Sequence, residues 1–314
     1  MDPHTGEIYA MATAPRFNAN RFPTTRADRR RNRAVTDTYE PGSTFKLVTV
    51  AAGLQERIIT PRTSFRLAPT LKVADRVIHE AHTRGTERLT VKQIVEQSSN
   101  IGTITIAEHL GAGRLASWID RFGFGAKTGV DFPGESPGFA LPLDKWSGST
   151  IGTVPIGHGI AVTPVQMARA YAAIANGGRL VRPHLIDRID GRTVGTTRGP
   201  RVVSRVVSDQ MLSMLRGVVL EGTGTEAAIP GYTVAGKTGT AAKIDPDGTY
   251  STSRYVASFV GLVPATKPSL VIMVMVDEPH GDIYGGVVAA PAFREIARFN
   301  LQRLEIPQDA PRTR

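Results

Sequence analysis

Three segments near the C-terminal end of the chain carry the pattern of a β-meander. They span residues 232–242, 255–263 and 270–276, and each is of strand length, with alternating or strongly apolar positions. Turn-forming sequences at 245–248 (Asp-Pro-Asp-Gly) and 264–267 (Pro-Ala-Thr-Lys) separate them. Because both connections are short, we expect the three strands to pair antiparallel.

Apolar residues recur at helical spacing over much of the rest of the chain. Helices are predicted over 46–54, 90–97, 99–110, 163–176, 208–220 and 290–304. Thr163 and Pro164 supply an N-cap and a first-turn proline for the fourth of these, and Ser208 is expected to cap the fifth. The start of the chain differs, because residues 6–13 alternate like a strand that leaves a tight turn.

The order of these elements predicts an α+β domain. An initial strand, a long helical insertion, and then strands with a terminal helix suggest a sheet lobe built from both chain ends beside a mostly helical lobe. We place the domain at 1–306, with the sheet lobe from about 1–40 and 200–306, the helical lobe over about 41–199, and a flexible tail at 307–314. A site is expected in the cleft between the lobes.

Composition narrows the chemistry further. The 314 residues include no cysteine, which excludes disulfides, thiolate metal sites and a cysteine nucleophile. The net charge is +10, but only residues 26–33 form a basic cluster, and this cluster lacks interleaved aromatic residues. We therefore expect no nucleic-acid partner. No run approaches the roughly 18 apolar residues of a membrane span, and residues 1–6 do not resemble an export signal.

The first candidate for catalysis is Ser43, which a lysine follows three residues later. A serine hydroxyl is a weak nucleophile until a neighbouring base takes its proton. On a helix, Ser43 and Lys46 share one face, within hydrogen-bonding reach of each other. Pro41 and Gly42 make a sharp entry, so Ser43 is expected in the first turn, where free N–H groups favour developing negative charge. By itself, this pattern arises easily by chance.

Two further motifs carry polar side chains. Ser98 and Asn100 lie at the junction of two predicted helices, where the alternative role for such residues is helix capping. The triplet Lys-Thr-Gly occurs twice, in a predicted loop at 127–129 and in a predicted strand at 237–239. We assign the site to the second copy, because its lysine and glycine share one face of the strand and glycine lets a substrate backbone approach.

Residues 231–238 also match the phosphate-loop pattern G-x-x-x-x-G-K-[ST]. A phosphate loop must follow a strand and open a helix. Here Gly239 comes directly after the pattern, a turn interrupts soon beyond, and residues 226–230 do not form a buried strand. An NTPase is therefore disfavoured.

Taken in order, the three motifs resemble those of the penicillin-binding protein and serine β-lactamase superfamily. The surrounding sequence looks closer still to class B penicillin-binding proteins, especially the division-specific (septal) type. Asparagine at position 100, where elongation-type relatives tend to have aspartate, favours the division type. The resemblance covers about residues 1 to 300, and its most specific segments are 31–46, 97–102, 128–135 and 157–166.

The resemblance implies a peptidoglycan D,D-transpeptidase that binds penicillin and other β-lactams through a serine acyl-enzyme. It implies the family's fold, a central antiparallel sheet flanked by helices plus a mostly helical subdomain. Ser43 would attack the penultimate D-alanine of a stem peptide, with neutral Lys46 as the base. Ser98 and Lys237 would pass a proton to the departing D-alanine. The substrate-binding residues would be Asn100, Thr238, Gly239 and Thr240.

The resemblance also bears on partners and location. It implies no cofactor, and the sequence offers no metal-ligand cluster. Expected partners are stem peptides, β-lactams and, through regions outside this chain, a glycosyltransferase of division or wall synthesis. The expected location is the extracytoplasmic face of the cell membrane. Because the family carries a transmembrane anchor and a pedestal domain before this point, we expect the sequence to be part of a longer protein.

Related activities remain as alternatives. A class A β-lactamase needs a glutamate in an E-x-x-L-N loop, and residues 135–139 do not supply it. A D,D-carboxypeptidase differs from a transpeptidase only in the acceptor, and a non-enzymatic β-lactam sensor would keep Ser43 without turning over peptide. The sequence leaves these two open.

Overall fold

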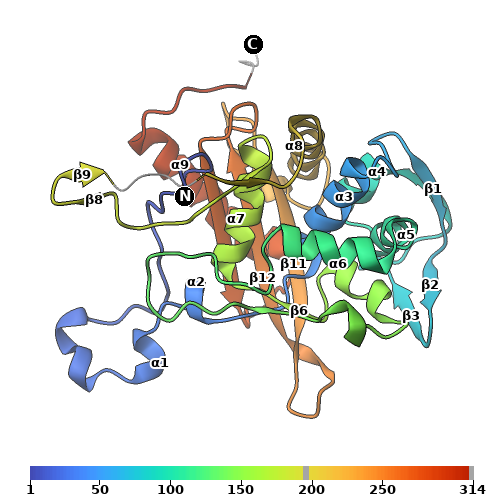
Figure 1. Ribbon diagram of the computed structural model, residues 1–314, viewed down its shortest axis with the longest axis horizontal. Coiled ribbons are helices and arrows are strands. Elements are labelled where there is room, and N and C mark those ends of the chain that lie inside the picture. The colour runs from blue at the N-terminus through green and yellow to red at the C-terminus, as the bar shows by residue number, and fades with distance from the viewer. Residues whose placement is uncertain (194–197, 311–314) are drawn as a thin grey trace.

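The computed structural model describes residues 1–193 and 198–310 of the chain. A three-stranded antiparallel sheet, in the order β11-β12-β13, runs through its centre (Figure 1). The strands are β11 (Ala235–Ile244), β12 (Tyr250–Val263) and β13 (Leu270–Asp277), and each pairs with the next along the chain. The predicted meander is therefore confirmed, although its first strand begins three residues later than expected.

Helices cover both faces of this sheet, because its side chains alternate between them. On one face, Phe259 and Val263 pack with α9 (Gly285–Arg303). A Cβ on Gly261 would lie only 2.2 Å from the Phe293 ring, so glycine is needed where α9 approaches the sheet. On the other face, Val260 and Leu262 join the main core of the molecule.

The main core is shared by helices from the middle of the chain. Two of them, α7 (Pro164–Ala175) and α8 (Arg205–Leu220), lie near the sheet, and the others form a helical lobe beside it (Figure 1). The lobe contains α3 (Lys46–Gln55), α4 (Val91–Glu96), α5 (Asn100–Leu110) and α6 (Ala112–Arg121). Every residue of α3 from Lys46 to Leu54 is buried, so α3 is the central helix of the lobe.

Short elements connect these layers. The remaining helices and 3-10 turns are η1 (Ala19–Thr24), α1 (Ala27–Arg30), α2 (Arg33–Thr36), η2 (Gly42–Phe45), η3 (Leu143–Lys145), η4 (Thr150–Gly152), η5 (Val154–Ile156) and η6 (Thr225–Ala227). Two-stranded ladders pair β1 (Ser64–Leu67) with β4 (Glu87–Thr90), β2 (Thr70–Val73) with β3 (Arg76–His79), and β5 (Phe139–Ala140) with β6 (Ile160–Ala161). Two more pair β7 (Arg179–Val181) with β10 (Arg198–Arg201) and β8 (Arg188–Ile189) with β9 (Arg192–Thr193). Within the described ranges, no helix is both long enough and apolar enough to cross a membrane.

The strand predicted at 6–13 is wrong. Only Glu7 in this stretch forms a bridge, and its partner is His184 rather than the central sheet. Met1 instead contacts β13, where its carbonyl accepts a 2.9 Å hydrogen bond from the Val271 N–H. The chain then turns between Asp2 and Gly6 and leaves the sheet. The sheet itself is therefore built from the C-terminal part of the chain.

Two helices begin earlier than predicted. Ser204, not Ser208, caps α8, and its hydroxyl accepts from the Val207 N–H. Ser208 lies inside the helix and donates to the Ile174 carbonyl, because its side chain points into the core. α9 starts at Gly285, where the missing Cβ lets the helix start close to the sheet.

The prediction of a flexible tail needs correction over residues 307–310. The Asp309 carboxylate accepts hydrogen bonds from the Thr233 N–H (2.7 Å) and from the hydroxyls of Thr233 and Thr266. The Ala310 N–H donates to the Gly231 carbonyl at 3.2 Å. These bonds hold the segment against the start of β11 and the turn after β12. The rest of the predicted tail, 311–314, lies outside the described residues.

Candidate active site

Ser43 lies in η2, a single 3-10 turn that runs directly into α3. Gly42 begins this turn with φ of +53°, a conformation that glycine adopts without strain. A Cβ on Gly42 would lie 2.9 Å from the Thr240 carbonyl oxygen, so glycine also lets the turn approach β11 closely. The half-buried Ser43 is thus held at the start of a buried helix and beside the edge of the sheet.

The Lys46 amine connects this turn to the second motif. Lys46 is 2% exposed, and its Nζ donates to the Ser98 carbonyl at 2.5 Å and to the Asn100 Oδ1 at 2.7 Å. Nζ also lies 3.3 Å from the Ser98 hydroxyl. The expected bond to the Ser43 hydroxyl is not formed, because the amine turns toward these carbonyl oxygens. Catalytic hydrogen bonds often tighten only when substrate is bound.

Burial makes Lys46 a candidate base. Desolvation lowers the pKa of Lys46 from 10.5 to about 7, and the nearby negative charge of Glu80 opposes this shift. A buried amine is held closer to neutrality because the interior solvates the ammonium form poorly. Near pH 7 a large fraction of Lys46 is therefore neutral and able to accept a proton.

Ser98 occupies the bend between α4 and α5 in a strained conformation. Its φ is +60°, which is uncommon for a residue other than glycine. The neighbouring Ser99 is the N-cap of α5, and its hydroxyl accepts from the Gly102 N–H at 2.9 Å. Helix capping was the alternative explanation for this motif, but Ser99 performs it. The side chains of Ser98 and Asn100 are both bonded to Lys46 instead.

The third motif lies on β11, an edge strand of the central sheet. Lys237 is 1% exposed, and its Nζ lies at the long hydrogen-bonding distances of 3.4 Å from the Thr238 carbonyl and 3.5 Å from the Thr238 hydroxyl. Burial, followed by the positive charge of Lys46, holds the pKa of Lys237 well below 10.5. The positive charge of the buried Lys46 therefore favours the neutral form of the buried Lys237.

The residues that follow Lys237 bring β11 against the Ser43 turn. A Cβ on Gly239 would lie 2.9 Å from the Pro41 carbonyl oxygen and 2.4 Å from the Ser258 hydroxyl. The Thr238 hydroxyl lies 2.6 Å from that of Thr223, and the Thr240 hydroxyl accepts from the Gly285 N–H at 3.1 Å. In the described part of the chain β11 pairs only with β12, which leaves one edge able to hold an extended peptide.

The other Lys-Thr-Gly triplet lies in a loop. The N–H groups of Thr128 and Gly129 donate to the Glu135 carboxylate at 2.6 and 3.1 Å, and Lys127 is exposed. The predicted placement of the two triplets is confirmed, one in a loop and one on β11, and the copy on β11 lies beside the Ser43 turn. The geometry also disfavours a phosphate loop at 231–238, because this stretch runs into β11 and opens no helix.

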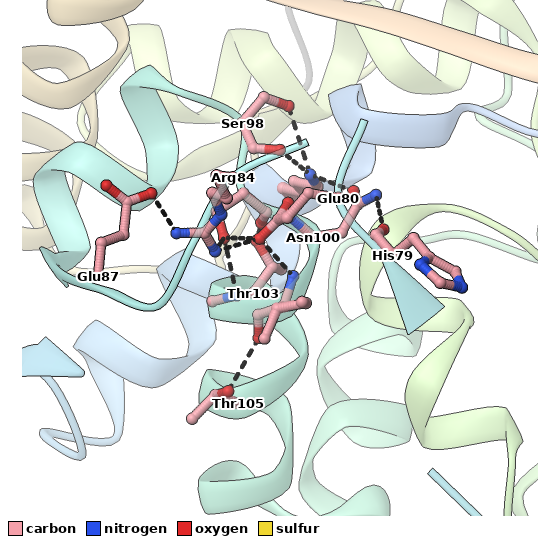
Figure 2. Close-up of polar contacts among 12 residues, drawn as sticks. His79, Glu80, Arg84, Glu87, Ser98, Asn100, Thr103 and Thr105 are labelled. Atoms are coloured by element: carbon pink, nitrogen blue, oxygen red, sulfur yellow. Dashed lines mark hydrogen bonds and ion pairs between the residues drawn. The ribbon is translucent and has the colours of Figure 1, made fainter. Parts of the chain in front are cut away.

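Sequence analysis missed a carboxylate that binds the second motif. Glu80, directly after β3, accepts from the Asn100 N–H and from the Ser99 hydroxyl, both at 2.6 Å (Figure 2). Arg84 lies between Glu80 and Glu87 and pairs with both. A single glutamate in a loop belongs to no recognisable pattern, so no sequence signal points to it.

Taken together, the geometry suits acyl transfer by a serine with a lysine base. A nucleophile candidate, a buried amine and an edge strand for an extended substrate lie at one place. Clusters of three or more metal-ligating side chains are absent among residues 1–193 and 198–310.

Comparison with known proteins extends this result. A family model described as the penicillin binding protein transpeptidase domain matches residues 1–298. The penicillin-binding protein PbpB of Mycolicibacterium smegmatis is 36% identical over 98% of this chain and 50% of its own length. Stage V sporulation protein D of Bacillus subtilis is 38% identical, over 98% of this chain and 49% of its own length. The peptidoglycan D,D-transpeptidase FtsI of Escherichia coli is 35% identical, over 99% and 52%. The chain thus spans about half the length of these relatives.

Solved structures confirm the predicted fold. Penicillin-binding protein 3 of Mycobacterium tuberculosis, complexed with aztreonam, superposes with a TM-score of 0.91 at 35% identity, over 99% of this chain and 73% of that one. The transpeptidase domain of penicillin-binding protein 3 from Burkholderia pseudomallei gives a TM-score of 0.86 at 34% identity, over 99% of this chain and 88% of that one.

Proposed function

Since the chain belongs to the transpeptidase domains of class B penicillin-binding proteins, we propose that it crosslinks peptidoglycan stem peptides through an acyl-enzyme on Ser43. The observation that carries this proposal is the buried Lys46 amine, which contacts the Ser98–Asn100 motif from the helix that follows Ser43. Lys46 follows Ser43 by three residues, and burial keeps a large fraction of its amine neutral, as the base for a serine nucleophile must be.

In the first half of the reaction, the Ser43 Oγ attacks the carbonyl carbon of the penultimate D-alanine. Neutral Lys46 takes the hydroxyl proton, for which its pKa of about 7 is suited. The N–H groups of Ser43 and Thr240 donate to the oxyanion of the tetrahedral intermediate. The approach of Gly42 to the Thr240 carbonyl supports this pairing, since it brings the two backbones together.

Departure of the terminal D-alanine requires a proton on its nitrogen. Ser98 and Lys237 relay this proton, a role supported by the burial of both side chains and by the 3.3 Å contact between Lys46 and the Ser98 hydroxyl. Asn100 holds the acyl amide of the donor, and Thr238 and Thr240 bind its terminal carboxylate. Gly239 lets the donor backbone lie along β11.

In the second half, the amine of another stem peptide attacks the acyl carbon and releases Ser43.

The names of the relatives support wall synthesis, and FtsI supports a septal role. β-lactams would acylate the same serine, which the aztreonam complex of the Mycobacterium tuberculosis neighbour supports. We place the domain at the extracytoplasmic face of the membrane, where stem peptides lie, with a wall glycosyltransferase as its partner.

A transfer assay tests this proposal against its alternatives. The protein is incubated with a small thioester donor that ends in a D-alanine analogue, with and without a D-amino acid as acceptor. A transpeptidase forms the new amide bond when the acceptor is present. If the donor is hydrolysed and no transfer product forms even with the acceptor present, the protein is a carboxypeptidase. A stable acyl-enzyme without turnover indicates a sensor.

A further inference from the structure

The Glu80 carboxylate lies at the N-terminal end of α5, among donors that all point at it. It accepts from the Ser99 hydroxyl and the Asn100 N–H at 2.6 Å, from the Ile101 N–H at 3.3 Å, and from Arg84. The Glu80 side chain is only 6% exposed. A carboxylate at this end of a helix also faces the favourable end of the helix dipole.

Arg84 compensates the buried charge of Glu80. It pairs with Glu80 on one side and with Glu87 on the other, and it also donates to the Ser99 hydroxyl at 3.2 Å (Figure 2). The bonds from Ser99, Asn100 and Arg84 keep the pKa of Glu80 below its usual value although burial opposes them. Glu80 is therefore ionised wherever the enzyme is expected to work.

His79 and Glu80, at the end of the β2–β3 hairpin, both hydrogen-bond to Asn100. Glu80 binds the Asn100 N–H, and the His79 carbonyl accepts from the Asn100 side-chain amide at 3.0 Å. The Oδ1 of the same side chain accepts from Lys46. A continuous path of bonds therefore runs from Glu80 through Asn100 to the candidate base.

We propose that Glu80 is a positioning residue for acyl transfer, which fixes the Ser98–Asn100 segment against Lys46 and orients the Asn100 amide toward the donor. This inference rests on the proposed function of the site. Glu80 does not touch the reacting atoms, and it acts through the residues that do. A displacement of such residues by about 1 Å is enough to slow an enzyme by about 100-fold.

The isosteric variant Glu80→Gln tests this role sharply. A carboxylate only accepts hydrogen bonds, whereas a glutamine would turn its NH₂ group toward one set of the donors that now converge on Glu80. Glu87→Gln is the matched control, since Glu87 binds the same Arg84 without touching Ser99 or Asn100. The negative charge of Glu80 raises the pKa of Lys46 against the effect of burial, and Lys46 in turn lowers the pKa of Lys237.

The measurement is the second-order rate of acylation by a fluorescent penicillin, followed across the pH range in which Lys46 titrates. We expect Glu80→Gln to acylate about 10- to 100-fold more slowly than wild type at the plateau, and Glu87→Gln to stay close to wild type. Loss of the negative charge should also move the acid limb of the Glu80→Gln profile to lower pH. Glu80→Asp keeps the charge, so its limb should not move even if its rate falls.

Three results would overturn the inference. The first is wild-type speed in Glu80→Gln. The second is an equal loss of acylation rate in Glu87→Gln. The third is a loss of acylation rate in Glu80→Gln without a shift of the acid limb of its pH profile. The second and third results would each indicate that Glu80 has a merely structural role. If Glu80→Gln does not fold, wild-type speed in Glu80→Asp overturns it. Absence of acylation in the wild type would instead refute the proposed function itself.

Discussion

The Nζ of Lys46 lies 2.7 Å from the Oδ1 of Asn100, although the two residues are 54 positions apart in the chain. This bond joins the helix that follows Ser43 to the start of α5. It couples the position of the candidate base to the amide that would hold the donor. A change in the protonation of Lys46 therefore changes a contact of the substrate-binding residue as well.

The pH dependence of acylation should report on Lys46. Because burial lowers its pKa to about 7, Lys46 is mostly protonated below that pH and cannot accept the proton of Ser43. The second-order rate of penicillin acylation should therefore rise with pH and level off above about 7. Stopped-flow or gel-based labelling measures this rate, and a profile that is flat through neutral pH would argue against a lysine base.

The two Lys-Thr-Gly triplets should respond very differently to mutation. Lys237→Ala removes a buried amine beside Lys46, so we expect acylation to slow by about 100-fold or more. Lys127→Ala is the natural control, because Lys127 is exposed in a loop, and its rate should be unchanged. The same labelling assay compares them. A larger effect at Lys127 would show that the site has been assigned to the wrong triplet.

The buried Lys237 should also destabilise the folded protein. Its folded-state pKa lies well below 10.5, so the unfolded chain binds more protons than the folded one in the interval between these values. Lys237→Met should therefore raise the free energy of unfolding at neutral pH, because it removes the cost of burying an ionisable amine. The gain should shrink as the pH approaches 10.5, where the unfolded lysine also loses its proton. Urea titrations at several pH values measure it, and a destabilised Lys237→Met would contradict the burial argument.

Sequence reasoning succeeded where local pattern and local chemistry agree. Short turns predict the meander, and Thr163 caps α7 with Pro164 in its first turn, as expected. Strand alternation also predicts that Lys237 lies on a strand, and the structure places this lysine, buried, on β11.

Sequence reasoning failed where packing between distant parts of the chain determines the structure. Ser204 and Ser208 are both plausible caps, and only the burial of Ser208 against Ile174 separates them. Glu80 binds Asn100 because the β2–β3 hairpin ends beside α5, and no local signal encodes this approach. The preference of Lys46 for the Ser98 and Asn100 oxygens likewise depends on two helices meeting.

The central claim is that Ser43 is the acylated residue. The most direct test is to label the wild-type protein with a penicillin, digest it, and map the modified peptide by mass spectrometry. The account predicts a single penicilloyl adduct on Ser43, and no label on a Ser43→Ala variant whose folding is verified by its thermal unfolding. An adduct on Ser98 or any other residue, or undiminished labelling of folded Ser43→Ala, would contradict it.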